Sequence, residues 1–151
     1  SEMPRFAPES FAYLHNDAPA QFKRFRDGLT QLLKEGVVQS FDQPDALVKT
    51  PLLGAVGPLQ FDVLQYRLES EYGAKSRLET APWSHIRWVR EKGSGTSGNR
   101  RGISRPTGQI PLGAAWAQDV FGQWVVLLPS AWTAKYFAED NTSLEVSSVP
   151  F

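Results

Sequence analysis

The stretch that most constrains the fold is residues 52–73, LLGAVGPLQFDVLQYRLESEYG. Its first five residues form a short apolar run interrupted by Gly54, which predicts a buried strand. Gly57 and Pro58 break this strand, and proline suits the first position of a helix because its missing N–H would have no partner there. Apolar residues continue at helical spacing up to Gly73, a residue that can adopt the left-handed conformation that ends a helix. The stretch therefore predicts a strand, a sharp corner and a helix.

This helix is expected to be apolar over much of its circumference. Its two adjoining apolar faces carry Leu59, Val63 and Tyr66, and Phe61, Leu64 and Leu68. Such a helix should lie between a sheet and a second partner. Gly54, Gly57 and Pro58 are expected to be structural residues of the corner, and a side chain at Gly57 is expected to clash with neighbouring backbone.

The segments around this centre follow the order of a split βαβ plait. The pattern predicts a strand after Pro8, a helix over residues 17–36, a strand over 37–41 and, after the central strand and helix, a strand over 75–80. The order strand–helix–strand–strand–helix–strand predicts an α+β fold, in which a ferredoxin-like antiparallel sheet carries both helices on one face. Residues 84–90 alternate as a further strand, so we expect this unit to span residues 1–90.

The composition changes after residue 90. Residues 91–110 are rich in glycine, serine and arginine with hardly an apolar side chain, which predicts a flexible loop. Residues 111–151 then predict a β-hairpin, a helix that begins after Pro129 and Ser130, and a closing strand. We expect this hairpin–helix–strand unit to extend the plait and to pack on the same domain.

The composition of the chain limits the classes of function that it can have. The chain has 151 residues, 41% of them hydrophobic, which suffices for a buried core. The absence of cysteine excludes disulfides and thiol catalysis, and the 16 basic and 16 acidic residues cancel, which argues against a chain devoted wholly to nucleic acid. No apolar run reaches membrane-spanning length, so no membrane partner is expected. The only methionine is Met3, so the chain is expected to begin inside a longer protein or to carry a short foreign leader.

No stretch of the sequence matches a known catalytic, phosphate-binding or metal-binding motif well. Residues 73–76, Gly-Ala-Lys-Ser, resemble a phosphate-binding loop, but they follow a helix and lack a glycine before the lysine. His15 and His85 have no second ligand at helical spacing, and Glu69 and Glu71 do not share a helix face. We therefore expect no catalytic, nucleotide-binding or metal site, and no cofactor in this chain.

Aromatic and basic residues stand together near the strand at residues 84–90. These residues are Trp83, Arg87, Trp88, Arg90 and Lys92. They suit stacking on nucleobases and pairing with phosphates. In the alternative interpretation, Trp88 packs on the sheet and the arginines are charges at its rim.

The decapeptide GAVGPLQFDV, residues 54–63, resembles the signature of the C-terminal domain of the peptide chain release factor 3 family of bacterial translational GTPases. Further stretches match the family in order, namely residues 4–9, 35–39, 67–72, 87–89 and 115–121. A weaker relation joins the chain to the corresponding plait of elongation factor G, in which a Gly-x-Leu-His corner stands in place of residues 57–60. The chain departs from the family in the loop of residues 92–109, in Pro58, and in lacking the nucleotide-binding domain and the β-barrel that precede this domain in the family.

The resemblance implies a ribosome-contacting domain of a cytoplasmic termination factor that, with GTP, promotes dissociation of class I release factors from the ribosome. GTP and Mg²⁺ are implied for the full-length protein alone, so this fragment is expected not to be an enzyme. Its implied partners are the ribosome and the upstream GTPase and β-barrel domains of the same protein, and neither DNA nor a membrane. The expected ribosome or RNA contacts are Arg87, Arg90, Lys92, Arg100, Arg101 and Arg105. The alternative is a stand-alone plait that binds RNA or a small molecule.

Overall fold

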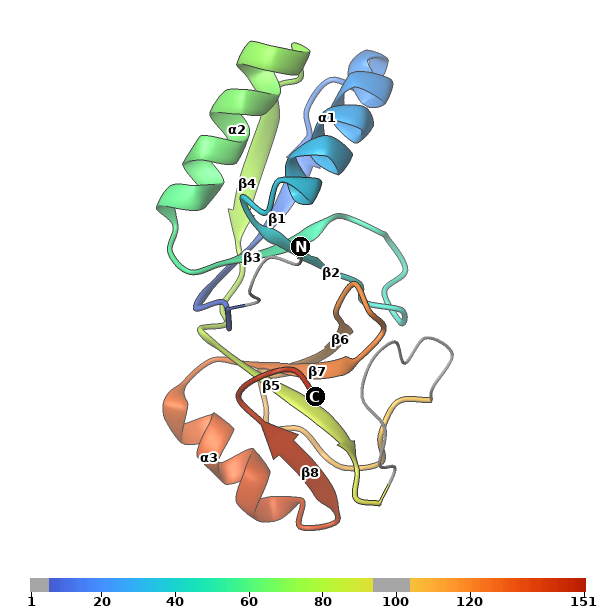
Figure 1. Ribbon diagram of the computed structural model, residues 1–151, viewed down its shortest axis with the longest axis vertical. Helices are drawn as coiled ribbons and strands as arrows, with labels where there is room; N and C mark the ends of the chain where they lie inside the picture. The colour runs from blue at the N-terminus through green and yellow to red at the C-terminus, as the bar shows by residue number, and fades with distance from the viewer. Residues whose placement is uncertain (1–5, 94–103) are drawn as a thin grey trace.

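The computed structural model describes residues 6–93 and 104–151, and it contains two four-stranded antiparallel sheets and three α-helices (Figure 1). The first sheet, here called the plait sheet, has the strand order β2-β3-β1-β4. Its unit consists of β1 (Ser10–Asn16), a 3-10 turn (Pro19–Gln21), α1 (Phe22–Lys34), β2 (Gln39–Phe41), β3 (Leu52–Ala55), α2 (Leu59–Tyr72) and β4 (Ser76–Thr80). This is the arrangement of a split βαβ plait, so the predicted α+β fold is confirmed.

The second sheet, here called the C-terminal sheet, has the order β6-β7-β5-β8. Its unit consists of β5 (His85–Glu91), β6 (Ala115–Gln118), β7 (Trp124–Leu128), α3 (Ala131–Asp140) and β8 (Leu144–Ser147). The predicted hairpin, helix and closing strand are β6 and β7, α3, and β8. The helix begins after Ser130 as predicted, and the Ser130 hydroxyl caps it by accepting the backbone N–H of Thr133 at 3.1 Å.

One strand lies in a different sheet from the one expected. We expected residues 84–90 to complete the first unit, but β5 pairs with β7 and β8 in the C-terminal sheet. The chain changes sheet over four residues: Ala81 N–H donates to the Phe11 carbonyl on β1, and Ser84 N–H donates to the Leu128 carbonyl on β7. Pro82, which has no N–H to donate, lies at the switch. By strand pairing, the plait therefore ends near residue 81 rather than at residue 90.

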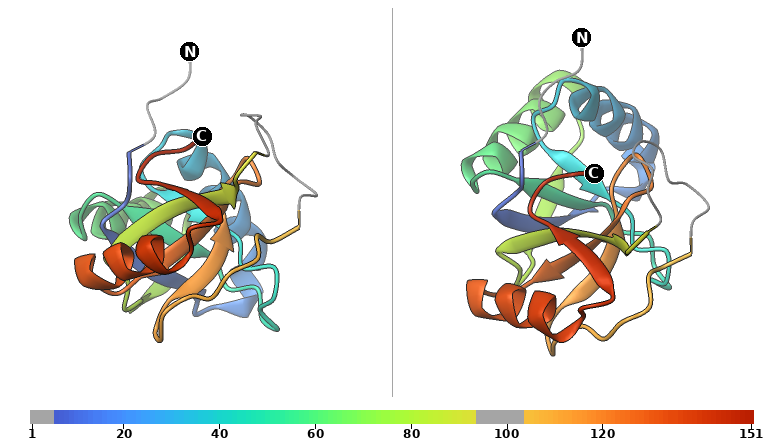
Figure 2. Two further views of the ribbon diagram at one scale, coloured as in Figure 1. Left: turned by 90° about the horizontal axis from the view of Figure 1, so that it is seen from below. Right: turned by 60° about the horizontal axis from the view of Figure 1, so that its bottom comes forward.

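The molecule has four layers, with α1 and α2 on the plait sheet, the C-terminal sheet beneath it and α3 outermost (Figures 1 and 2). Three apolar clusters fill the three interfaces. The middle cluster joins the two sheets, and it comprises Phe11, Phe41, Leu52, Ala81, Ile86, Trp88, Ala117, Val125 and Leu127. The sheets are joined at their rims as well, because Asp42 after β2 and Gln118 of β6 exchange two backbone hydrogen bonds of 2.9 and 2.7 Å.

The corner between β3 and α2 is present, but a different glycine is confined. A Cβ on Gly54 would lie 2.9 Å from both Phe41 and Pro8, so only glycine fits there without displacement. A Cβ on Gly57 would meet only Gln60 Oε1, at 3.6 Å, so the expected clash at Gly57 is wrong. Pro58 is the N-cap of α2, and Gly73 ends the helix in the left-handed conformation at φ 68°, as predicted.

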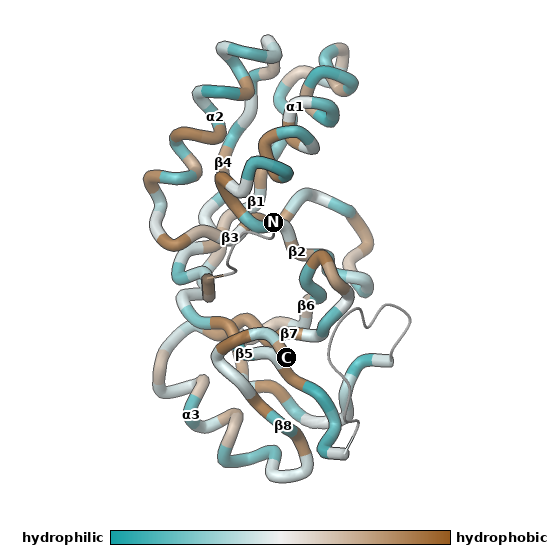
Figure 3. The backbone as a smooth tube through the Cα atoms, viewed as in Figure 1, coloured by the Kyte–Doolittle hydropathy of each residue, from teal (hydrophilic) through white to brown (hydrophobic). Residues whose placement is uncertain are grey.

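The hydropathy of the residues varies with their place in the layers. Figure 3 shows hydrophobic segments along strands of both sheets, and further ones along α2. Among the described residues, no helix combines the length and apolarity needed to cross a bilayer.

Candidate functional site

The basic residues expected to make contacts lie along β5 and on the segment that follows it. Arg87 and Arg90 are on β5, Lys92 follows its last residue, and Arg105 lies on the segment that leads to β6. Arg100 and Arg101 fall outside the described residues. The structure therefore places four of the six predicted residues, and it does not bring them together as one cluster.

Arg90 is bound to an acidic partner on the neighbouring strand. It lies directly opposite Glu145 of β8, and its Nε and Nη2 atoms donate to the two carboxylate oxygens at 2.7 and 3.1 Å. Its guanidinium carbon lies 4.1 Å from the ring centroid of Phe151, a cation–π distance. The hydrogen bonds to Glu145 raise the pKa of Arg90, and those from Arg90 lower the pKa of Glu145. Arg90 thus contributes little free positive charge to the surface.

Lys92 lies at the base of a closed loop. Its side chain is exposed, and its backbone N–H donates to the Ser143 carbonyl at 3.2 Å. The carboxylate of the preceding Glu91 accepts the backbone N–H and the hydroxyl of Thr107 at 2.7 and 2.8 Å, which lowers the pKa of Glu91. The two ends of the basic stretch from Lys92 to Arg105 are therefore held next to each other on the C-terminal sheet.

The described part of the predicted flexible loop is anchored. Gln109 and Asn141 exchange two hydrogen bonds, from Gln109 N–H to Asn141 Oδ1 at 3.2 Å and from Asn141 Nδ2 to the Gln109 carbonyl at 3.1 Å. Arg105 Nη1 donates to Asp45 Oδ2 at 2.9 Å, and its guanidinium carbon lies 5.7 Å from the Trp116 ring. Residues 104–110 are therefore fixed to the β2–β3 loop and to the end of α3 rather than free, which the Gly/Ser composition of the loop did not predict.

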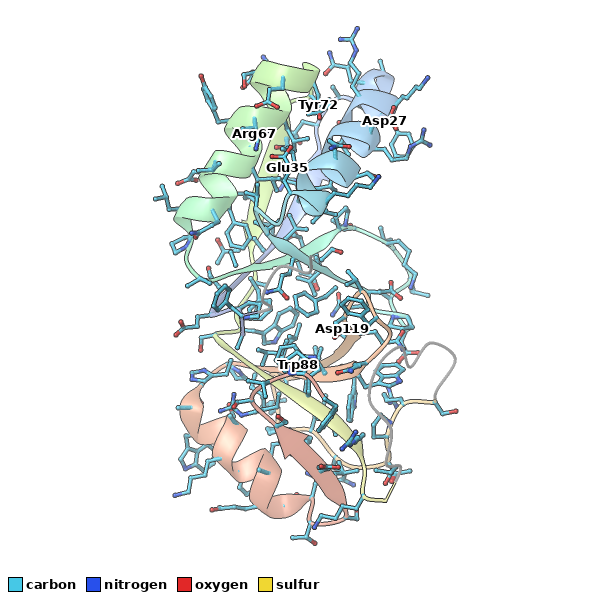
Figure 4. The ribbon with its side chains drawn as sticks, in the orientation of Figure 1. Asp27, Glu35, Arg67, Tyr72, Trp88 and Asp119 are labelled. Atoms are coloured by element: carbon cyan, nitrogen blue, oxygen red, sulfur yellow. The ribbon has the colours of Figure 1, made fainter. Side chains whose placement is uncertain are left out.

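The tryptophans near β5 belong to the core. Trp88 is fully buried, and its indole N–H donates to Asp119 Oδ2 at 3.0 Å, so it has no face for a nucleobase (Figure 4). Trp83 packs edge-on against Phe11 and Tyr13 and donates its N–H to the Gly113 carbonyl at 2.8 Å. The packing interpretation is therefore correct for Trp88, and the partly exposed Trp83 packs on the same cluster.

Asp119 is a buried carboxylate whose role the sequence analysis missed. Besides the Trp88 indole, it accepts the backbone N–H groups of Phe121 and Gln123, each at 2.9 Å through Oδ1. It therefore fixes the β6–β7 turn and joins that turn to β5. The available signal was an aspartate that begins a turn closed by Gly122, a position where a carboxylate commonly binds backbone N–H groups.

Some of the other basic residues in the described chain are paired with acidic side chains, and others are exposed without such a partner. On the helical surface, Arg67 of α2 binds Glu35 and Glu71, with its closest contact to each at 2.7 Å, and Figure 4 shows Arg67 and Glu35 facing each other between α1 and α2. Lys23 and Lys34 of α1 are exposed and have no acidic partner within 4 Å among the described residues. The exposed cations of α1 lie at the opposite end of the molecule from the C-terminal sheet (Figure 1).

The geometry argues against a phosphate cradle at residues 73–76. These residues follow the C-terminal end of α2, where a helix presents carbonyl oxygens and a negative dipole rather than N–H groups. His15 contacts Glu79 at 2.7 Å, and His85 contacts the Ser84 hydroxyl at 2.9 Å.

Comparison with known proteins places this architecture in a family. The family model described as class II release factor RF3, C-terminal domain, matches residues 1–138. The chain is 38% identical to peptide chain release factor 3 of Acaryochloris marina and 37% identical to that of Gloeothece citriformis, in each case over 97% of this chain and 26% of the relative. The factor of Synechococcus elongatus is 38% identical over 97% of this chain and 25% of the relative.

The chain thus spans about a quarter of the length of the curated relatives it matches. The match runs through the plait and most of the C-terminal unit, which decides against an unrelated stand-alone plait. The chain belongs to the family of class II release factor RF3 C-terminal domains.

Proposed function

We propose that this chain is the ribosome-contacting C-terminal domain of a translation termination factor that, with GTP, promotes dissociation of class I release factors from the ribosome. The observation that carries the proposal is the match to peptide chain release factor 3 over nearly the whole chain. The fragment contributes binding surface, and GTP with its Mg²⁺ would be bound by the parts of the full-length factor that precede it.

The basic stretch between Lys92 and Arg105 is the proposed contact with ribosomal RNA. Its four cations are Lys92, Arg100, Arg101 and Arg105. Glu91 and Thr107 hold the ends of the stretch together, so a phosphate contact here would be presented from the end of β5 in the C-terminal sheet. Arg87 and Arg90 precede this stretch on β5. We expect them, like Arg105, which is paired with Asp45, to contribute less, because Arg90 is bound to Glu145 and Arg87 donates to the Ile86 carbonyl at 2.8 Å.

Replacement of Arg100, Arg101 and Arg105 by alanine in the full-length factor tests the proposal. Contacts to phosphate displace counterions, so their loss should weaken ribosome association and make it less dependent on salt. Release-factor recycling should fall in parallel, while the melting temperature of the factor should change little, because these arginines stand in a Gly/Ser-rich stretch with hardly an apolar side chain. The measurements are ribosome binding over a salt titration and the rate of release-factor recycling.

A matched control removes the same number of charges from the opposite end of the molecule. The variant Lys23→Ala, Arg26→Ala, Lys34→Ala changes three exposed cations of α1 and should leave binding and its salt dependence near the wild-type values. Normal recycling by the loop variant across the whole titration would show that the stretch is only a connection. A loss of ribosome binding in the α1 variant alone would show that the contact lies on the plait.

A further inference from the structure

The outer face of α2 is apolar and uncovered in this chain. Leu59, Val63 and Tyr66 project from successive turns and are 67%, 41% and 73% exposed. Their spacing of four and three residues places them on one face of the helix. Val56, at the corner before the helix, is exposed as well. Figure 3 shows hydrophobic segments on α2 at the end nearest β3. We call these four residues the α2 stripe.

The packing of the domain does not explain the stripe. α2 contacts the plait sheet and α1 through a different face, whose Phe61, Leu64 and Leu68 are buried in the helix–sheet core. Single exposed apolar residues are ordinary on a protein surface, whereas a continuous row of large ones is typical of an interaction face. The second partner expected from the sequence for this helix is therefore absent from the described chain.

The charges around the stripe favour a protein partner over a nucleic acid. Asp62 and Glu69 lie on the same helix, are exposed and have no basic partner within 4 Å among the described residues. The one cation of α2, Arg67, is bound by Glu35 and Glu71. This surface would repel phosphate groups. It complements a protein segment that carries apolar side chains flanked by lysine or arginine.

The chain enters the domain next to the stripe. Glu9 N–H donates to the Ala55 carbonyl at 2.9 Å, directly before Val56, and Pro8 packs on Gly54. Phe6, the first described residue, is largely exposed. The matched family is a C-terminal domain, and the chain covers about a quarter of the relatives, so most of each relative's polypeptide precedes this point. A segment tethered so close would be present at high effective concentration.

We propose that the α2 stripe is the docking face for the part of the same polypeptide that precedes this domain in the full-length factor. The occupant would place apolar side chains on Leu59, Val63 and Tyr66 and basic side chains beside Asp62 and Glu69. This inference rests on the family membership and not on the proposed ribosome contact.

Single cysteines test the proposal, since this chain has no cysteine of its own. In a cysteine-free full-length factor without ribosomes, Tyr66→Cys is compared with Trp132→Cys, which replaces an α3 residue of nearly equal exposure, 70%. The reagent is an uncharged maleimide. A face that is covered nine-tenths of the time should react about tenfold more slowly than the control. Leu59→Cys should show the same protection.

Equal reaction rates at Tyr66→Cys and Trp132→Cys would overturn the proposal. Protection that disappears on dilution would identify a second copy as the occupant and would overturn it too. A photo-crosslinking residue at position 66 gives an independent measurement, in which a crosslink to the preceding part of the same chain supports the proposal and a crosslink only to another chain contradicts it. Because no ribosome is present, failure of the proposed ribosome contact would leave these results unchanged.

Discussion

The plait half and the C-terminal half share the apolar cluster between their sheets but close their outer surfaces in different ways. Two helices, α1 and α2, cover the plait sheet, and the outer face of α2 keeps a row of exposed apolar residues. One helix, α3, covers the C-terminal sheet. Polar contacts join β5 of this sheet to neighbouring segments, among them Arg90 with Glu145 and Glu91 with Thr107.

This difference separates charges that hold the fold from charges that are available to a partner. On the C-terminal half, Arg90 and Arg105 are both ion-paired, so the number of cations in that part of the sequence overstates the charge at its surface. On the plait half, the free charges beside the apolar stripe are acidic. We infer that the two halves face different partners, RNA at the C-terminal loop and protein at α2.

The largest expected effect tests whether the two halves are one cooperative unit. Trp88→Ala should lower the free energy of unfolding by about 3–5 kcal/mol, because it leaves a cavity between the sheets and removes the donor to Asp119. Urea unfolding of the variant should stay a single transition. The control Trp132→Ala, at an exposed site, should change stability by less than about 0.5 kcal/mol. Two separate transitions in the variant would show that the sheets fold independently.

The next largest effect is expected from the buried hydrogen bonds of the C-terminal half. Asp119→Ala should cost roughly 2–3 kcal/mol, because the backbone N–H groups of Phe121 and Gln123 and the Trp88 indole lose their acceptor in a buried site. Asp119→Asn keeps one acceptor oxygen and should cost less. Thermal unfolding of the two variants measures the difference, and equal melting temperatures for Asp119→Ala and wild type would refute the role of this carboxylate.

A glycine pair tests the corner of the plait half. Gly54→Ala should lower the free energy of unfolding by about 1–2 kcal/mol, because its methyl group would press on Phe41 and Pro8. Gly57→Ala should change it by less than about 0.5 kcal/mol, since the site has room for a Cβ. Chemical denaturation compares the two, and a greater loss at Gly57 would contradict the corner geometry.

The smallest expected effect concerns the partly buried ion pair between Arg90 of β5 and Glu145 of β8. Arg90 lowers the pKa of Glu145 below its ordinary 4.5, so the stabilisation by this carboxylate is complete above pH 4.5 and is lost as the pH falls through the lowered pKa. Glu145→Gln should therefore be slightly less stable than wild type at neutral pH, and the difference should vanish in acid and shrink in high salt. A difference independent of pH would show that the pair contributes no charge interaction.

The local parts of the fold were predictable from sequence, because they depend on neighbouring residues. The helical spacing of α2, its end at Gly73 and the β6–β7 hairpin are examples. The partner of β5 was not predictable, since the alternation of Ile86 and Trp88 suits either sheet and the choice depends on contacts with β7 and β8.

The site was less predictable than the fold for the same reason. Arg90 and Glu145 are 55 residues apart, and Arg105 and Asp45 are 60 apart, so no local pattern shows that these cations are paired. The glycine that limits packing, Gly54, is confined by Pro8 and Phe41, which are distant in sequence. The second apolar face of α2 was visible in the sequence, whereas its exposure required the structure.

Hydrogen exchange of the full-length factor, with and without the ribosome, shows whether the C-terminal half contacts the ribosome. We expect ribosome binding to slow exchange in the stretch from Lys92 to Thr107 and to leave the exposed side of α1 unchanged. Slower exchange confined to α1, or no change in residues 92–107 at saturating ribosome, would contradict a ribosome contact by the C-terminal half.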